Sequence, residues 1–404
     1  MKWEKVKLGN VCEITSSKRI FYSEYVDDGV PFYRSKEIIE SDEGKVIENP
    51  LYISVDKYNK IKEKFGVPQT GDMLLTSVGT IGIPYIIKKK DCFYFKDGNL
   101  TWFRDFREGL NSKYLYYWIK SSEGTGILYN TTIGSSQKAL TISALKNIKI
   151  SLPPRSVQDK IVEVISAYDD LIENNQKQIK LLEEAAQRLY KEWFVDLRFP
   201  GHENTKIVDG VPEGWNICPF SSKVDIMSGG TPKTSIPDYY NGRIPFYTPK
   251  DSDGAFFAYK TQMNITEGGL KNCNSRLYPP KTVIITARGT VGKTTILAVP
   301  MAMNQSCYAL KMKENDAPYY LFFALNNEIK ALQTMANGGV FNTIIGKTFD
   351  SINIQIPKDP LIYGFEETVR PFMEQIKNKL QANSKLVEAR NRLLPKLMNG
   401  EVEA

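Results

Sequence analysis

The feature that most constrains the fold is an internal repeat, because this chain of 404 residues contains one unit twice. Segments of the first half recur in the same order in the second half, and from Gly134 and Gly338 onward the offset stays at 204. The matched pairs are WEKVKLGNV (3–11) with WNICPFSSK (215–223), GVPFYRSKEI (29–38) with GRIPFYTPKDS (242–252), GDMLLTSVGTIG (71–82) with PKTVIITARGTVG (280–292), and GSSQKALTISALKNIKISLPP (134–154) with GGVFNTIIGKTFDSINIQIPK (338–358). We therefore predict two copies of one globular block, each followed by a helix, which is too few and too large a unit for a solenoid.

The pattern inside each block predicts an α+β fold with small mixed sheets rather than alternating βαβ units. Short apolar runs predict strands, and aromatic-rich segments at 111–122 and 317–332 predict helices in matching places of the two copies. The predicted strands are MLLTSV (73–78), YIIKK (85–89), IKISL (148–152), TVIITA (282–287) and SCYALKM (306–312).

Two long helices are predicted after the blocks. After LPPRSVQDK, with Ser156 as the expected N-cap, apolar residues recur at spacings of four and three. Asn175 is the one polar member of this seam, where it either fixes the register or faces solvent. The seam consists of Ile161, Ile165, Tyr168, Ile172, Asn175, Ile179, Leu182, Ala186, Leu189 and Trp193.

The second helix repeats the seam, and its apolar face is wider than that of the first helix. Asn383 and Arg390 interrupt the matching stripe, while Leu380, Val387 and Leu394 broaden its apolar face. We expect the two helices to form an intramolecular antiparallel coiled coil, and an Asn175→Leu exchange to be neutral or stabilising unless that amide has a buried partner. The extra apolar surface either faces a partner subunit or packs on its own block. The matching stripe consists of Phe365, Val369, Phe372, Ile376, Leu386, Leu393 and Leu397.

Composition excludes several classes of chemistry. The five cysteines form no CxxC pair, and the only histidine, His202, stands in a polar stretch, so a cysteine-rich zinc site, a histidine metal cluster and a Ser-His or Cys-His couple are all disfavoured. No apolar run is long enough to span a bilayer, and the N-terminus lacks a signal-peptide core, so we expect a cytoplasmic protein without a membrane partner.

The positive charge is concentrated in the two blocks. The net charge is +7, with 23 basic and 18 acidic side chains in residues 1–153 and 15 and 12 in residues 199–355. The remaining segments together carry 15 basic and 16 acidic side chains. This distribution fits a polyanionic partner at the blocks.

Four segments resemble the specificity subunits of Type I restriction-modification systems. They are LPPRSVQDKIV (152–162), RLYKEWFVDLRFPGHE (188–203), DGVPEGW (209–215) and EARNRLLPKLMNGEVEA (388–404). The order of parts also resembles that family: target-recognition domain 1 (1–154), a central spacer helix (155–198), target-recognition domain 2 (199–356) and a C-terminal spacer helix (357–404).

The resemblance implies a non-catalytic reader of double-stranded DNA that needs no cofactor of its own. Each recognition domain would bind one half of an interrupted, asymmetric site, and the helices would set the spacer between the halves. The implied partners are two modification (methyltransferase) subunits and separate restriction (translocase and nuclease) subunits. Two similar domains joined by a stiff element would set half-site spacing as dimeric DNA readers do.

Candidate DNA contacts are hydrogen-bonding and basic residues on matching loops of the two copies. In the first copy they are Lys18, Arg19, Arg34, Lys36, Thr76, Ser77, Thr80, Ser136, Gln137 and Lys138, with Ser16, Ser35 and Ser135 beside them. In the second copy they are Thr231, Lys233, Thr248, Lys250, Arg288, Thr290, Lys293, Asn304, Gln305 and Asn342. The neighbouring aromatics Phe32, Tyr33, Phe246 and Tyr247 fit a core better than a stacking platform.

One motif imitates a phosphate-binding loop. ARGTVGKT (287–294) follows a predicted strand, but its first residue is not glycine, the first copy reads SVGTIGIP, and the next segment predicts a strand instead of a helix. We therefore expect no nucleotide site there.

Two other classes of function remain to be weighed. A methyltransferase or nuclease carrying its own recognition domain would need an Asn/Asp-Pro-Pro-aromatic loop or a D…ExK cluster, and neither occurs. A coiled-coil interaction scaffold without DNA specificity is the alternative function.

Overall fold

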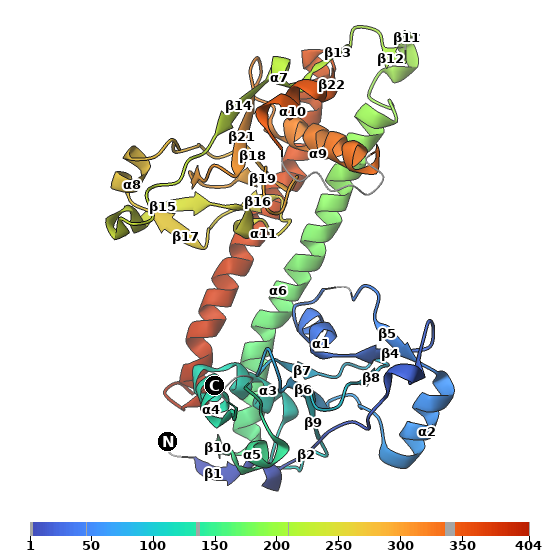
Figure 1. The fold of residues 1–404 in the computed structure, drawn as a ribbon, viewed down its shortest axis with the longest axis vertical. Coiled ribbons are helices and arrows are strands. Elements are labelled where there is room, and N and C mark those ends of the chain that lie inside the picture. Colours follow the sequence, from blue (N-terminus) through green and yellow to red (C-terminus); the bar gives the residue numbers. More distant parts are fainter. Residues whose placement is uncertain (1–2, 46, 135–137, 209, 336–343, 404) are drawn as a thin grey trace. The chain divides into compact units, whose positions relative to one another are not determined.

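In the computed structural model, residues 3–45, 47–134, 138–208, 210–335 and 344–403 are described, without the side chains of 330–335. The chain forms two compact units, Met1–Ile172 with Lys385–Ala404 and Glu173–Ser384. Each unit combines one α+β head with a segment of each long helix (Figure 1). The sequence-based domain boundaries, which treat the helices as separate parts, stay a prediction.

The head of the first unit is built from two four-stranded sheets and one two-stranded sheet (Figure 1). The first sheet has the order β2 (Glu13–Thr15), β9 (Leu100–Arg104), β6 (Met73–Thr76) and β7 (Pro84–Ile86). The second has the order β3 (Tyr25–Val26), β5 (Leu51–Ile53), β4 (Val30–Tyr33) and β8 (Tyr94–Phe95), and β1 (Glu4–Lys7) pairs with β10 (Lys149–Leu152). The helices are α1 (Ser35–Asp42), α2 (Val55–Phe65), α3 (Ser112–Lys120), α4 (Ser122–Thr131) and α5 (Ile142–Asn147).

The head of the second unit has the same plan. Its five-stranded sheet has the order β14 (Val224–Ser228), β21 (Cys307–Met312), β18 (Val283–Thr286), β19 (Thr294–Leu297) and β16 (Phe257–Ala258). Its three-stranded sheet has the order β17 (Met263–Ile265), β15 (Tyr240–Tyr247) and β20 (Ala302–Met303), and β13 (Asn216–Pro219) pairs with β22 (Asn353–Ile356). A small hairpin, β11 (Ile207–Val208) with β12 (Val211–Pro212), precedes the head. The helices are α7 (Phe220–Lys223), α8 (Glu267–Lys271), α9 (Pro318–Met335) and α10 (Gly346–Ser351).

Strand pairing shows that the sequence repeat is a structural repeat. In each head the first strand pairs antiparallel with the last, as β1 with β10 and β13 with β22. Both heads share one parallel pair, β4 with β8 and β15 with β20, and the second head has a further parallel pair, β16 with β19. All five predicted strands and both aromatic-rich helices are present, with ends within three residues of the predicted ones, which confirms the predicted α+β class.

The first long helix, α6, spans Arg155–Tyr190 and continues as a π-helical turn over Lys191–Val195. The expected N-cap at Ser156 is wrong, because the helix begins one residue earlier. The carbonyl of Pro154 accepts from the amides of Val157 (2.9 Å) and Gln158 (3.1 Å), so the proline before the helix takes the place of a side-chain cap.

The second long helix, α11, spans Asp359–Met398 and runs antiparallel to α6 within each unit. In the first unit, Ile161 and Ile165 share a buried core with Leu394 and Leu397. In the second unit, residues 179 and 186 of α6 share a core with residues 369 and 376 of α11. The predicted seam and the antiparallel pairing are thereby confirmed inside both units.

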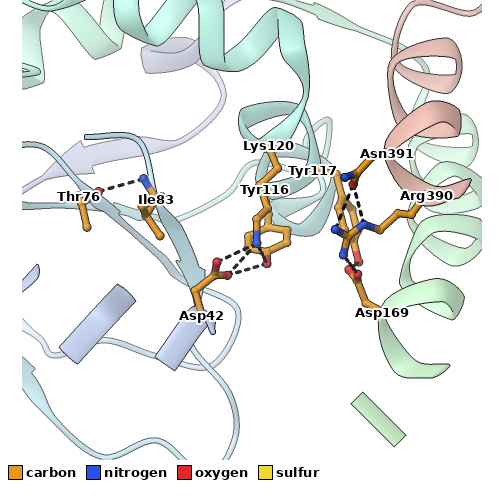
Figure 2. Close-up of polar contacts among 9 residues, drawn as sticks. All are labelled: Asp42, Thr76, Ile83, Tyr116, Tyr117, Lys120, Asp169, Arg390 and Asn391. Atoms are coloured by element: carbon orange, nitrogen blue, oxygen red, sulfur yellow. Dashed lines mark hydrogen bonds and ion pairs between the residues drawn. The ribbon is translucent and has the colours of Figure 1, made fainter. Parts of the chain in front are cut away.

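The polar residues that interrupt the two apolar seams each have a polar partner. In the second unit, Asn175 Nδ2 donates to Asn383 Oδ1 over 2.8 Å. In the first unit, the Arg390 guanidinium contacts Asp169, which also accepts a 2.8 Å hydrogen bond from the Tyr117 hydroxyl of α3 (Figure 2). The amide at position 175 is therefore not a simple surface residue.

The additional apolar residues of α11 pack inside the protein wherever the structure describes their contacts. Leu394 is buried in the core of the first unit, and Leu380 packs against the core of the second. These contacts favour packing on its own block over a free face for a partner subunit.

One buried polar side chain ties each head to its own long helix. In the first unit, Gln158 of α6 accepts from the Asn111 amide (2.9 Å) at the start of α3 and donates to the carbonyl of Gly109 (2.7 Å). In the second unit, Glu366 of α11 accepts from the Tyr320 amide (2.7 Å) in the first turn of α9. Burial raises the pKa of Glu366 to about 7, against the opposing effect of the amides that donate to it.

Candidate DNA interface

In the second head, the loops that carry the candidate residues meet at one edge, which we call the second loop edge (229–233, 248–251, 287–293, 304–306 and 344). The loops follow the ends of β14 and β18, which flank β21 in the five-stranded sheet, and of β15 and β20, which are neighbours in the three-stranded sheet. Backbone hydrogen bonds join them: Gly230 N to Met303 O (3.1 Å), Asn304 N to Tyr247 O (3.0 Å), Ala287 N to Ser306 O (2.7 Å) and Ile344 N to Ala287 O (2.9 Å). Residues that are far apart in the sequence are thus held in one place.

The first head has an equivalent edge, the first loop edge (16–20, 34–36, 77–82, 96–99 and 138–140). The joining bonds are Lys18 N to Tyr94 Oη (2.6 Å), Lys96 N to Tyr33 O (2.8 Å), Ser77 N to Asn99 O (2.8 Å) and Leu140 N to Ser77 O (2.9 Å). The same convergence in both heads means that the repeat presents one type of polar loop edge twice.

Most described candidates are exposed at these edges. The exposed residues are Lys18, Arg19, Lys36, Thr80 and Lys138 in the first head and Thr231, Lys233, Lys250, Arg288, Thr290, Lys293 and Gln305 in the second, while Arg34 and Asn304 are half-buried. Both edges therefore offer lysine and arginine for phosphates and amides or hydroxyls for base edges. Ser135, Ser136, Gln137 and Asn342 lie outside the described residues.

Three candidate hydroxyls have structural roles instead. Thr76 is fully buried, and its Oγ1 accepts from the Ile83 amide over 2.9 Å (Figure 2). Ser77 is also buried, 2.7 Å from Thr101 Oγ1, and Thr248 donates to Asp251 over 2.8 Å. Because these hydroxyls already hold the loops and face away from solvent, we remove them from the set of proposed DNA contacts.

Several basic side chains are partly engaged within the protein. The Arg34 guanidinium lies 2.6 Å from Glu37, whose carboxylate also accepts from the Arg34 backbone amide (2.7 Å) at the start of α1, and 40% of the Arg34 side chain is exposed at the surface. Burial acts to raise the pKa of Glu37, but hydrogen bonds from Arg34 and from backbone amides outweigh it and lower the pKa. Arg19 lies 2.8 Å from Asp97, and Lys138 Nζ lies 3.7 Å from the Tyr129 ring. Such surface pairs are weak and exchange readily for a phosphate.

The predicted core role of the four aromatics is confirmed for Phe32, Phe246 and Tyr247, which are at most 1% exposed. Tyr33 is half-buried and stacks on Phe93, with 4.2 Å between ring centroids.

One loop of the first edge was missed from sequence. Lys96 and Asn99 lie in the loop between β8 and β9, which is the counterpart of the loop that carries Asn304 and Gln305 in the second head. None of the four matched sequence pairs covers this loop, and its place after the parallel strand is known only from the structure. The hydroxyls of Ser16 and Ser35 at the same edge are buried and, within the described residues, have no hydrogen-bond partner.

Two of the five cysteine thiols are buried, and the described residues form no metal-binding cluster. No cluster of three or more His, Cys, Asp or Glu side chains that could hold a metal ion is found among them. Burial raises the pKa of the Cys12 and Cys307 thiols to about 12, and His202 Nδ1 lies 2.8 Å from the Phe199 carbonyl. Within the described part of the chain, no helix has both the length and the apolar character needed to cross a bilayer.

Two α+β heads of one repeat, each with a basic and polar loop edge and each attached to an antiparallel helix pair, define a two-headed nucleic-acid reader. The family described as "Type I restriction modification DNA specificity domain" matches residues 1–184 and 212–381. The chain belongs to this family, and sequence-specific DNA recognition for a Type I restriction-modification complex is its function. Family membership sets the scaffold alternative aside.

Relatives match over most of the chain. The Type I restriction enzyme MjaIX specificity subunit of Methanocaldococcus jannaschii is 27% identical, covering 99% of this chain and 93% of the relative. The HindI specificity subunit of Haemophilus influenzae is 25% identical, covering 65% of this chain and 71% of the relative. The fold is similar to the crystal structure of a Type I restriction-modification S subunit from M. genitalium, with a TM-score of 0.59 at 15% identity over 98% and 96% of the two chains.

Proposed function

We propose that each loop edge reads one half of a bipartite, interrupted DNA site, and that the chain itself performs no chemistry. The observation that supports this most directly is the repetition of one convergent loop edge in two heads whose exposed residues differ. Covalent joining of two such edges suits an asymmetric site, because the halves need not be identical.

The partners follow from this role. Methylation would be carried out by two modification subunits docked on the helix pairs, and translocation and cleavage by restriction subunits. The assembly would work on double-stranded DNA in the cytoplasm, with the helices setting the length of the unread spacer.

A head exchange tests the division of labour. Replacing residues 215–350 by the second head of another family member should change only one half of the methylated sequence, as read by methylation-aware sequencing of the host genome. The reciprocal exchange of the first head is the matched control and should change only the other half. Altered methylation at both halves after a single exchange contradicts the proposal.

A gel-shift series on the complex with the modification subunits tests the loop edges directly. Arg288→Gln should weaken binding by about 1–3 kcal/mol on the cognate duplex if Arg288 reads a base, and should relax specificity at one position. Lys206→Gln, an exposed lysine outside both loop edges, is the control. Binding that is independent of sequence and insensitive to salt would contradict the assignment of DNA reading to the loop edges.

A further inference from the structure

A pocket of about 670 Å³ lies inside the second unit, beside the second loop edge. One wall is the end of α6, a second is the loop 291–294, and a third is α9. Arg188 and Lys191 line it from α6, Lys293 from the loop, and Phe322, Phe323 and Asn326 from α9. The wall formed by α9 is thus largely apolar, and the ionisable side chains come from two separate segments of the chain, α6 and the loop 291–294.

The charge of this pocket is positive. Within the described part of the chain, Arg188 and Lys293 take part in no ion pair, whereas Lys191 lies 2.5 Å from Asp196. Glu184, the one acidic lining residue, is 4.0 Å from Lys180. Two exposed cations therefore remain available to an anion, and the anion's own charge would not be opposed by an unmatched carboxylate.

The loop cannot hold a nucleotide in the manner of a phosphate-binding loop. The Gly292 amide donates to the Thr286 carbonyl (2.9 Å) and the Lys293 amide donates to Thr286 Oγ1 (3.0 Å), so both amides face inward. Strand β19 follows, so there is no helix N-terminus to add its dipole. Because two of the loop amides face inward and no helix dipole assists the others, the exposed side chains of Arg188 and Lys293 supply the main contacts for an anion, and this favours a single phosphodiester group over a chelated polyphosphate.

The first head has the same loop with a different residue at the decisive position. There the Gly82 amide donates to the Thr76 carbonyl (2.8 Å), and the Ile83 amide donates to Thr76 Oγ1 (2.9 Å; Figure 2). The two loops thus share their anchoring threonine, but Ile83 stands where the second head has Lys293. The cation is a property of the second head and not a requirement of the fold.

We propose that this pocket holds one backbone phosphate of the bound duplex, through Arg188 and Lys293, so that α6 itself contacts DNA beside the second head. This inference rests on the proposed function, and it adds to the loop edge a contact that carries no sequence information. The long helix would then position the second head on its half-site as well as support it.

The test measures binding of one fixed mixed-sequence duplex by the complex with the modification subunits, over a series of salt concentrations. Lys293→Ile, which copies the first head, and Arg188→Gln should each reduce the slope of log K against log salt by about 0.9 and weaken binding about fivefold at physiological salt. Lys358→Gln, an exposed lysine of the same unit that does not line the pocket, should leave the slope unchanged. Lys293→Gln keeps a polar side chain and should behave as Lys293→Ile, which separates loss of charge from a folding defect.

Each other outcome has a defined meaning. Slopes that stay at the wild-type value in both variants overturn the phosphate site, while a wild-type complex that still prefers its own target keeps the proposed function intact. A wild-type complex without any sequence preference contradicts the proposed function instead. If ATP displaces the duplex from the wild-type complex but not from Lys293→Ile, the pocket binds free nucleotide and the DNA assignment is wrong.

Discussion

Replacing Asn175 by leucine perturbs the one hydrogen bond that joins the polar members of the helix seam in the second unit. Both Asn175 and Asn383 are half-buried, and 2.8 Å separates the donor nitrogen from the acceptor oxygen. The sequence alone suggested that leucine would be neutral or stabilising. The structure changes that expectation, because the exchange removes a donor from Asn383.

The magnitude follows from two opposing effects. An intramolecular hydrogen bond of this kind contributes about 1–1.5 kcal/mol net. A half-buried leucine side chain regains roughly 0.5 kcal/mol by removing apolar surface from water. We therefore expect Asn175→Leu to cost about 0.5–1 kcal/mol, and the double variant Asn175→Leu with Asn383→Leu to recover it through a Leu–Leu contact, giving a coupling free energy of about 1–2 kcal/mol.

Hydrogen exchange is the appropriate assay, because a chain of two units does not unfold in two states. Peptides over residues 170–185 should exchange about two- to fivefold faster in Asn175→Leu, since a factor of ten corresponds to 1.4 kcal/mol. Asn174→Leu, the exposed neighbour on the same turn, is the control and should change the rate by less than twofold.

The reasoning is refuted by either of two results. Slower exchange in the single variant would mean that leucine packs better than the amide pair. Additive effects in the double variant would mean that the two amides do not interact in solution.

Two further predictions concern a loop and a buried acid. Thr286→Val removes the hydroxyl that accepts from Lys293 N and contacts the Thr290 carbonyl. The local stability of residues 287–293, measured by hydrogen exchange, should therefore fall by about 1–3 kcal/mol. Thr290→Val, at an exposed residue of the same loop, is the control and should have little effect. Glu366 has a folded pKa of about 7, raised by burial, so the folded protein binds the proton more tightly than the unfolded chain and the second unit should lose stability as the pH rises from about 4.5 to 7. Glu366→Gln still accepts from Tyr320 and should abolish that loss of roughly 3 kcal/mol. A pH-stability profile equal to wild type would contradict the assignment.

The sequence by itself determined the repeat, the α+β class and the two long helices. These features depend on periodicities that act locally, namely apolar spacings of two in strands and of three and four in helices. The same periodicity singled out Asn175, Asn383 and Arg390 as polar residues within an apolar stripe.

Only the tertiary structure decided what the polar residues do. Thr76 and Thr80 are equally hydrophilic in sequence, yet Thr76 is buried against the Ile83 amide while Thr80 is exposed. Likewise, no local pattern pairs Asn175 with Asn383 or brings Arg188 and Lys293 to the same pocket, because the members of each pair are more than a hundred positions apart in the sequence. A side chain's role depends on which backbone and side-chain groups the fold brings to it, and that information lies in the packing of the whole unit.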